Sequence, residues 1–106
     1  MLPQYIIILG ARSASASGSG KAGKFDESDY RMIEKIVREE HGFEGCTMIR
    51  AKGFYQQHEE DTVQIIVLAE NYEKIKDCAQ QLRSRFRQDS VLVVSAGVGE
   101  FLTSSR

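Results

Sequence analysis

The sequence has no tryptophan, one proline and only two cysteines in 106 residues. Two cysteines are too few for a disulfide framework, and Cys46 and Cys78 lack the C-x-x-C spacing of redox or zinc motifs. We therefore expect both to be reduced core residues of a cytoplasmic protein. No set of histidine, cysteine and carboxylate residues has metal-ligand spacing, so the sequence predicts neither a metal site nor a cofactor.

An excess of one charge and a long apolar run are also missing. The formal net charge is −1, from 14 basic and 15 acidic residues. Proteins that bind duplex DNA usually present a basic face, and a membrane span needs roughly 20 apolar residues. We therefore exclude both partners. The length suits one domain covering residues 1–106, with a flexible Ser/Gly/Lys loop at 12–24.

Strand-like and helix-like segments follow one another in the order βαββαβ. The expected strands cover residues 4–11, 46–55, 62–69 and 90–98, with a polar hairpin connection at 56–61. One helix is expected over 26–40, capped by Asp26, and a second begins after the cap Asn71. This order predicts an α+β, ferredoxin-like sandwich, in which two helices cover one face of an antiparallel four-stranded sheet.

Both faces of this sheet are apolar in the sequence. Ile6 and Ile8 alternate with Ile7 in the first strand, and Ile66 and Leu68 lie on the second face of the third. A sheet face in water normally carries a polar residue at every second position. We therefore expect a second copy of the chain to cover this face, in a homodimer or higher oligomer. The alternative is a monomer whose own N-terminal segment or loop covers it.

The segment 12–24 joins the first strand to the first helix and reads R-S-A-S-A-S-G-S-G-K-A-G-K. It fails as a Walker A motif because Phe25 stands where a serine or threonine would hold magnesium. Gly/Ser-rich backbone can still gather amide groups around an anion beside a helix N-terminus. Two interpretations stay open: a flexible surface loop, or a loop that orders on an anionic ligand through Arg12, Lys21 and Lys24.

More cations end the second helix. Arg83, Arg85 and Arg87 complement the helix dipole, and this alone can account for them. Arg83 and Arg87 also share a helix face, where with the loop cations they would form a phosphate site. Phe54 and Tyr55 end the second strand, and such rings either pack in a core or interface or stack on a base.

Catalytic patterns are weak. His41 and Cys46 lack a third, orienting group, and His58 lies beside the acidic run 59–61 in an expected solvated turn. No Ser-His-Asp pattern or glycosidase-like carboxylate pair stands out. The sequence therefore predicts a binding protein that is not an enzyme.

Three short stretches carry a family resemblance: G-F-E-G-C-T from Gly42, A-K-G-F-Y-Q from Ala51, and F-R-Q-D-S-V-L-V from Phe86. They resemble the first type of Thoeris anti-defence protein, or a related uncharacterised bacterial family with an F-x-Q-x-S-V-L ending. The resemblance spans residues 25–94. It implies a phage protein that sequesters a cyclic ADP-ribose isomer or a cyclic oligonucleotide without catalysis, in oligomers with ligands near subunit boundaries.

The resemblance also implies site residues. Phe54 and Tyr55 become base-stacking candidates, and the run Arg87, Gln88, Asp89 and Ser90 would contact phosphate and ribose. The chain departs from the family at 12–24, where a short Asn-containing turn is expected. Two other classes stay open. One is a nitrogen-regulator-like domain that binds adenine nucleotides between subunits, and the other is a small ferredoxin-like oxygenase or isomerase.

Overall fold

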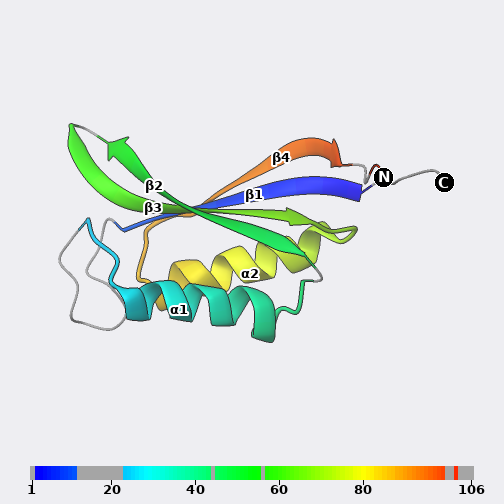
Figure 1. Ribbon diagram of the computed structural model, residues 1–106, viewed down its shortest axis with the longest axis horizontal. Helices are drawn as coiled ribbons and strands as arrows, with labels where there is room; N and C mark the ends of the chain where they lie inside the picture. The colour runs from blue at the N-terminus through cyan, green and yellow to red at the C-terminus, as the bar shows by residue number, and fades with distance from the viewer. Residues whose placement is uncertain (1, 12–22, 44, 56, 100–101, 103–106) are drawn as a thin grey trace.

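The structure is a computed structural model that describes residues 2–11, 23–43, 45–55, 57–99 and 102 (Figure 1). The elements are β1 (Leu2–Gly10), α1 (Glu27–Lys35) with a π-helical continuation (Ile36–Glu40), β2 (Cys46–Tyr55), β3 (His58–Leu68), α2 (Tyr72–Arg85) and β4 (Leu92–Gly99). No helix among the described residues is long and apolar enough to cross a membrane.

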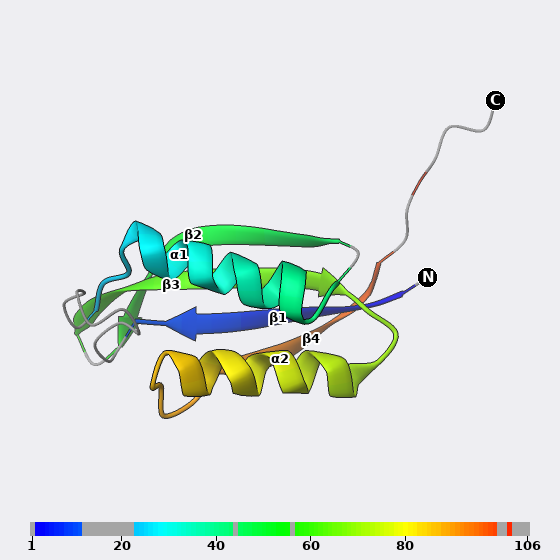
Figure 2. The same ribbon diagram turned by 90° about the horizontal axis from the view of Figure 1, so that it is seen from below.

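The four strands form one antiparallel sheet in the order β2-β3-β1-β4. Figures 1 and 2 show α1 and α2 side by side on one face of this sheet, with the other face uncovered. The predicted ferredoxin-like α+β sandwich is therefore confirmed.

Both predicted helix caps are present. The Asp26 carboxylate accepts a 2.9 Å hydrogen bond from the Asp29 amide, and the Asp29 carboxylate accepts one from the Asp26 amide. This reciprocal pair is a capping box, which satisfies two amides that the first helical turn leaves without partners. In α2, the Asn71 side chain accepts a hydrogen bond from the Glu73 amide at 2.9 Å.

The core lies between the sheet and the two helices. Its largest fully buried side chains come from the two central strands and both helices with their ends: Phe86, Ile7, Leu9, Ile33, Ile36, Ile65, Ile75 and Leu82. Each such side chain stabilises the fold by about 1.5–3 kcal/mol relative to exposure. The rings of Phe25 and Phe86 meet edge to face at 5.7 Å, which joins the start of α1 to the end of α2.

The predicted polar connection at 56–61 is wrong. β2 and β3 stay paired as far as Tyr55 and His58, and Gln57, just before His58, has a φ of 68°. Two-residue hairpins need positive φ, because such turns match the twist of the strands. His58 and Glu59 are exposed, but Glu60 and Asp61 are buried in β3 and do not form the expected solvated turn.

The helix-free face is as apolar as predicted. Ile49 and Leu92 are 42% and 58% exposed on this face. The register places the following apolar side chains on it: Ile6, Ile8, Ile49, Ile66, Leu68, Leu92 and Val94.

Both cysteines are free thiols. The predicted flexible loop at 12–24 lies outside the described residues, apart from Gly23 and Lys24.

Candidate functional site

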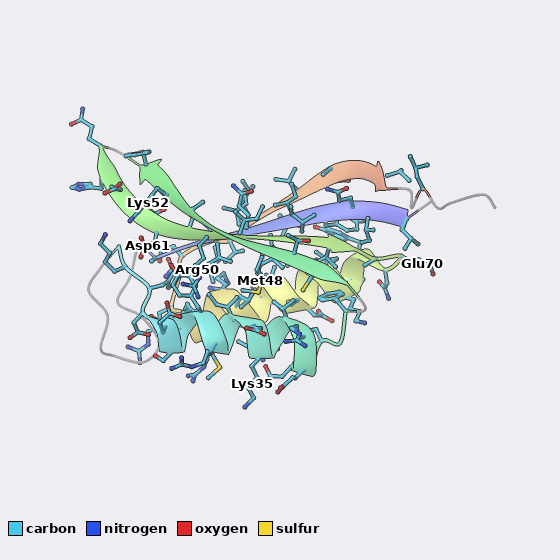
Figure 3. All side chains as sticks on the ribbon, viewed as in Figure 1. Lys35, Met48, Arg50, Lys52, Asp61 and Glu70 are labelled. Carbon is cyan, nitrogen blue, oxygen red and sulfur yellow. The ribbon has the colours of Figure 1, made fainter. Side chains whose placement is uncertain are left out.

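The hairpin end of the sheet carries a cluster of charged side chains around Asp61. Asp61 lies in β3 with its side chain on the face of the sheet that the helices cover. Lys52 of β2 is its direct partner in the strand register. The Lys52 ammonium donates a 2.8 Å hydrogen bond to one oxygen of the Asp61 carboxylate, and the Phe25 amide donates one at 3.0 Å to the other. Figure 3 shows Lys52 and Asp61 together at this end. Asp61 therefore ties the hairpin to the chain entering α1.

The backbone of Asp61 holds both ends of the segment 12–22. The Ala11 amide donates to the Asp61 carbonyl at 2.9 Å, and the Asp61 amide donates to the Gly23 carbonyl at 2.8 Å. Gly23 has a φ of 85°, and a Cβ there would lie 3.3 Å from the Glu59 carbonyl oxygen. Glycine suits this position because it tolerates positive φ. The Ser/Gly/Lys segment therefore leaves and re-enters the described fold beside the charged cluster.

Electrostatics in this cluster favour the charged forms. Burial on its own would raise the pKa of the Asp61 carboxyl, but the hydrogen bonds from Lys52 and Phe25 outweigh it and lower this pKa. The same hydrogen bond to Asp61 raises the pKa of the Lys52 ammonium. Asp61 is thus held as a carboxylate at neutral pH and is not a proton donor there.

A second cluster of side chains lies next to the charged cluster around Asp61, between α1 and β2. The Arg50 guanidinium lies 3.8 Å from the centre of the Tyr30 ring and binds both carboxylate oxygens of Glu27, at 2.8 and 3.1 Å. Hydrogen bonding to Arg50 lowers the pKa of Glu27. Burial and the nearby Asp61 raise the pKa of the Tyr30 phenol. Tyr30 therefore stays protonated and can donate a hydrogen bond.

Glu60 lies on the opposite, helix-free face, because successive strand residues alternate between faces. It is only 8% exposed. A Cβ at Gly10 would lie 2.6 Å from a carboxylate oxygen of Glu60, and one at Gly53 would lie 3.7 Å from its Cγ. The carboxyl group thus occupies space that side chains on β1 and β2 would otherwise fill. This places a second buried carboxylate at the hairpin end, on the face that we expect another copy to cover.

Two of the aromatic and loop residues predicted from the sequence lie at this end in the described part of the chain. Lys24 is exposed and precedes α1, and its charge acts on Asp61. Phe54 is 76% exposed and pairs with Glu59 in the register. Arg12, Lys21 and the side chain of Tyr55 lie outside the described part of the chain.

The predicted residues that follow α2 form the turn into β4. Figure 2 shows that this turn, the start of α1 and the hairpin all lie at one end of the molecule. Arg83 donates to the Gln80 side chain at 2.9 Å and to the Gln88 carbonyl at 3.4 Å. Gln88 is 4% exposed, and its side-chain amide donates to the Phe86 carbonyl at 2.9 Å. Arg83 and Gln88 therefore stabilise the turn itself.

Other residues of this turn are arranged differently. Arg87 adopts a φ of 55°, a left-handed conformation that is uncommon outside glycine, and its side chain is exposed. Asp89 and Ser90 are exposed beside it. Their roles as ligand contacts stay predictions.

Sequence reasoning missed the carboxylates and their partners. The run Glu59–Asp61 reads as a solvated turn because three acids follow one another. The signal that could have found them is the pair of glycines, Gly10 and Gly53, near the ends of the neighbouring strands. Glycine in a strand often marks a close approach by another group. Among the described residues, no group of three or more histidine, cysteine or carboxylate residues could hold a metal ion.

No protein-family model matches the sequence, and no curated protein matches it. Solved structures do match. A phage S-adenosylmethionine (SAM) lyase in complex with S-methyl-5′-thioadenosine aligns with a TM-score of 0.64 at 18% identity, over 92% of this chain and 83% of the other. The apo form aligns with a TM-score of 0.60 at 20% identity, over 91% and 82%.

The divalent ion tolerance protein CutA1 from Ehrlichia chaffeensis aligns with a TM-score of 0.53 at 10% identity, over 96% of this chain and 87% of that one. At such identities these likenesses establish a shared fold.

Proposed function

We propose that this chain binds a small adenosine compound at the hairpin end, and that SAM is the ligand class that its charges fit best. The observation that carries the proposal is the fold likeness to a lyase that holds S-methyl-5′-thioadenosine, an adenine nucleoside, over nearly the whole of both chains.

The carboxylates at this end support a cationic ligand, while exposed Lys24 and Arg87 are the cations that a phosphate would need. The two cations nearest the hairpin are engaged by carboxylates, Lys52 by Asp61 and Arg50 by Glu27. Glu60 is a buried carboxylate on the helix-free face, and we propose that the cation of the ligand joins or replaces the interaction that Glu60 makes within the chain. SAM carries a positive sulfonium and an ammonium group, which a carboxylate attracts strongly where water is excluded.

The site is proposed to be completed by a second copy of the chain. Glu60 lies on the helix-free face, which carries apolar side chains from all four strands. A copy packed on this face would exclude water from Glu60 and from the ligand. This is the homo-oligomer expected from the sequence, with the ligand at the subunit boundary.

For the fate of the ligand, we propose cleavage that releases S-methyl-5′-thioadenosine. SAM can break its Cγ–S bond without a metal or redox partner: its own α-carboxylate attacks Cγ, a new C–O bond closes homoserine lactone, and the sulfonium leaves as the neutral thioether S-methyl-5′-thioadenosine. A site of this kind needs to hold the methionine chain in a reactive conformation and to exclude water. This proposal departs from the non-catalytic expectation of the sequence.

The second candidate function is sequestration of a cyclic nucleotide without catalysis. It is favoured by the Thoeris-type stretches and by the exposed run Arg87, Asp89 and Ser90 at the same end of the molecule. Here phosphate contacts would come from Lys24 and Arg87. Either fate suits a phage protein that counters a host defence, a setting that the resemblance and the phage origin of two solved neighbours support.

One incubation separates the two candidates. The purified chain is mixed in parallel with SAM, cyclic ADP-ribose isomers and cyclic dinucleotides, and the products are identified by mass spectrometry. We expect S-methyl-5′-thioadenosine from SAM, a strong loss of this product in Glu60→Gln, and no change in the control Glu59→Gln, whose side chain is exposed. Tight binding and intact recovery of a cyclic nucleotide, with SAM untouched, would favour sequestration instead.

A further inference from the structure

Within the described part of the chain, no strand pairs with the outer edge of β4. β4 pairs only with β1 among the described strands, and this pairing is regular from Leu92 with Ile8 to Ser95 with Tyr5. No described backbone hydrogen bond outside the helices and sheet involves β4. An edge strand presents a row of N–H and C=O groups to which another extended chain can pair.

The usual protection of an edge strand is missing from the first half of β4. Proteins blunt such edges with charged residues, proline or bulges. Leu92, Val93 and Val94 carry none of these, and Leu92 is 58% exposed. The irregularity in pairing comes only beyond Ser95, where Gly97 has a φ of 90°. The regularly paired, apolar part of the edge is therefore the part that we expect to accept a further strand.

A cationic groove runs beside this edge on the helix side of the sheet. It has a volume of about 290 Å³ and lies between α2 and β4, lined by Tyr72, Lys76, Ala79, Gln80, Arg83, Val91 and Val93. Lys76 and Arg83 are the charged residues of this lining. The Tyr72 ring packs on Tyr5 with centroids 5.5 Å apart and is 46% exposed. The groove therefore combines two positive charges with an apolar floor.

We propose that the β4 edge binds an extended acidic segment of a partner protein, which adds to the sheet as a fifth strand. Backbone hydrogen bonds to β4 would supply affinity. Alternate side chains of an added strand point to the same face, so every second residue of the partner enters the groove. Carboxylates there would meet Lys76 and Arg83, and the residues between them would continue the apolar helix-free face.

This surface is separate from the proposed ligand site. It uses the outer edge of the sheet, whereas Glu60 and Asp61 lie on the inner strand β3. Its failure would therefore leave the ligand proposal standing, and the reverse also holds.

The probe is a terminally blocked seven-residue peptide that alternates glutamate and valine, titrated into the ¹⁵N-labelled full chain. We expect shifts of the β4 amides and weakening by about 10-fold in Lys76→Glu. The control Lys35→Glu, on the outer surface of α1 (Figure 3), should not weaken binding. A peptide methylated at the backbone nitrogens that face the edge should not bind, because it cannot pair with the strand.

Three results would overturn the proposal. One is equal binding of the methylated peptide, which would show that the peptide does not bind by adding to the sheet as a strand. Another is the absence of β4 shifts at millimolar peptide. The third is an oligomer of the chain that dissociates in Lys76→Glu but not in Lys35→Glu, because the edge would then belong to a second copy.

Discussion

Lys52 and Asp61 face each other across the β2–β3 ladder, and their side chains form a 2.8 Å ion pair on the helix side of the sheet. The Asp61 carboxylate also accepts the Phe25 amide. A single carboxylate thus joins two strands to the chain that enters α1. Through its backbone it also holds both ends of the segment 12–22. These contacts fix the position of the hairpin end relative to α1, and a ligand bound there would meet a preformed surface.

Asp61→Asn should lower the free energy of unfolding at pH 7 by about 1 kcal/mol, because the charged hydrogen bonds are weakened. The folded protein lowers the pKa of Asp61 below its ordinary value of 3.8. This stabilisation is therefore full above that value and is lost as the pH falls through the folded pKa. Urea denaturation at pH 7 and pH 3 should show the difference between wild type and variant shrinking at low pH. A constant difference would contradict the account.

Gly10→Ala should change ligand binding more than stability. The new methyl group would lie 2.6 Å from a carboxylate oxygen of Glu60, which is the end of a flexible side chain and can move aside. We expect a small shift in melting temperature and a clear loss of SAM binding. Gly45→Ala is the matched control, since a Cβ there meets nothing within 4 Å. Unchanged SAM binding in Gly10→Ala would show that Glu60 is not part of the ligand site.

Ile49→Arg should dissociate the proposed oligomer. Ile49 is 42% exposed on β2 and points to the helix-free face, so the charge would be buried in the interface without a partner. Light scattering after size exclusion gives the mass. Tyr72→Arg, an equally exposed aromatic on α2, is the control and should keep the oligomer. A wild-type monomer at micromolar concentration would refute the interface.

Both cysteines should resist thiol reagents in the folded chain. Burial raises the pKa of Cys78 to about 12 and also raises that of Cys46, so little thiolate is present at pH 8. Reaction with a chromogenic disulfide reagent should be slow, and both thiols should react at once in denaturant. Fast labelling of the native protein would show that neither is the core residue that the sequence predicts.

The sequence predicts the fold well because its signals are local. Asp26 and Asn71 precede their helices and cap them, and the spacing of apolar residues after Asn71 marks the buried face of α2. The apolar second face of the sheet follows from simple alternation in β1 and β3. Each of these features depends on residues a few positions apart.

The site is predicted less well because its key contacts join distant residues. Asp61 meets Lys52 and Phe25 only through the register and the entry to α1, at separations of 9 and 36 residues. An acidic run gives no sign that two of its members will be buried. Phe54 and Arg87 do gather at this end, and both follow from their places at a strand end and a helix end as well as from the family resemblance. Their roles as ligand contacts stay predictions.

Isothermal titration with SAM and S-adenosylhomocysteine tests the central claim most directly, because the two differ by one methyl group and the positive charge on sulfur. The account predicts that the wild-type chain binds SAM about 10-fold more tightly. It also predicts that this preference disappears in Glu60→Gln. Equal affinity of the wild type for both compounds, or no binding of SAM at millimolar concentration, would contradict it.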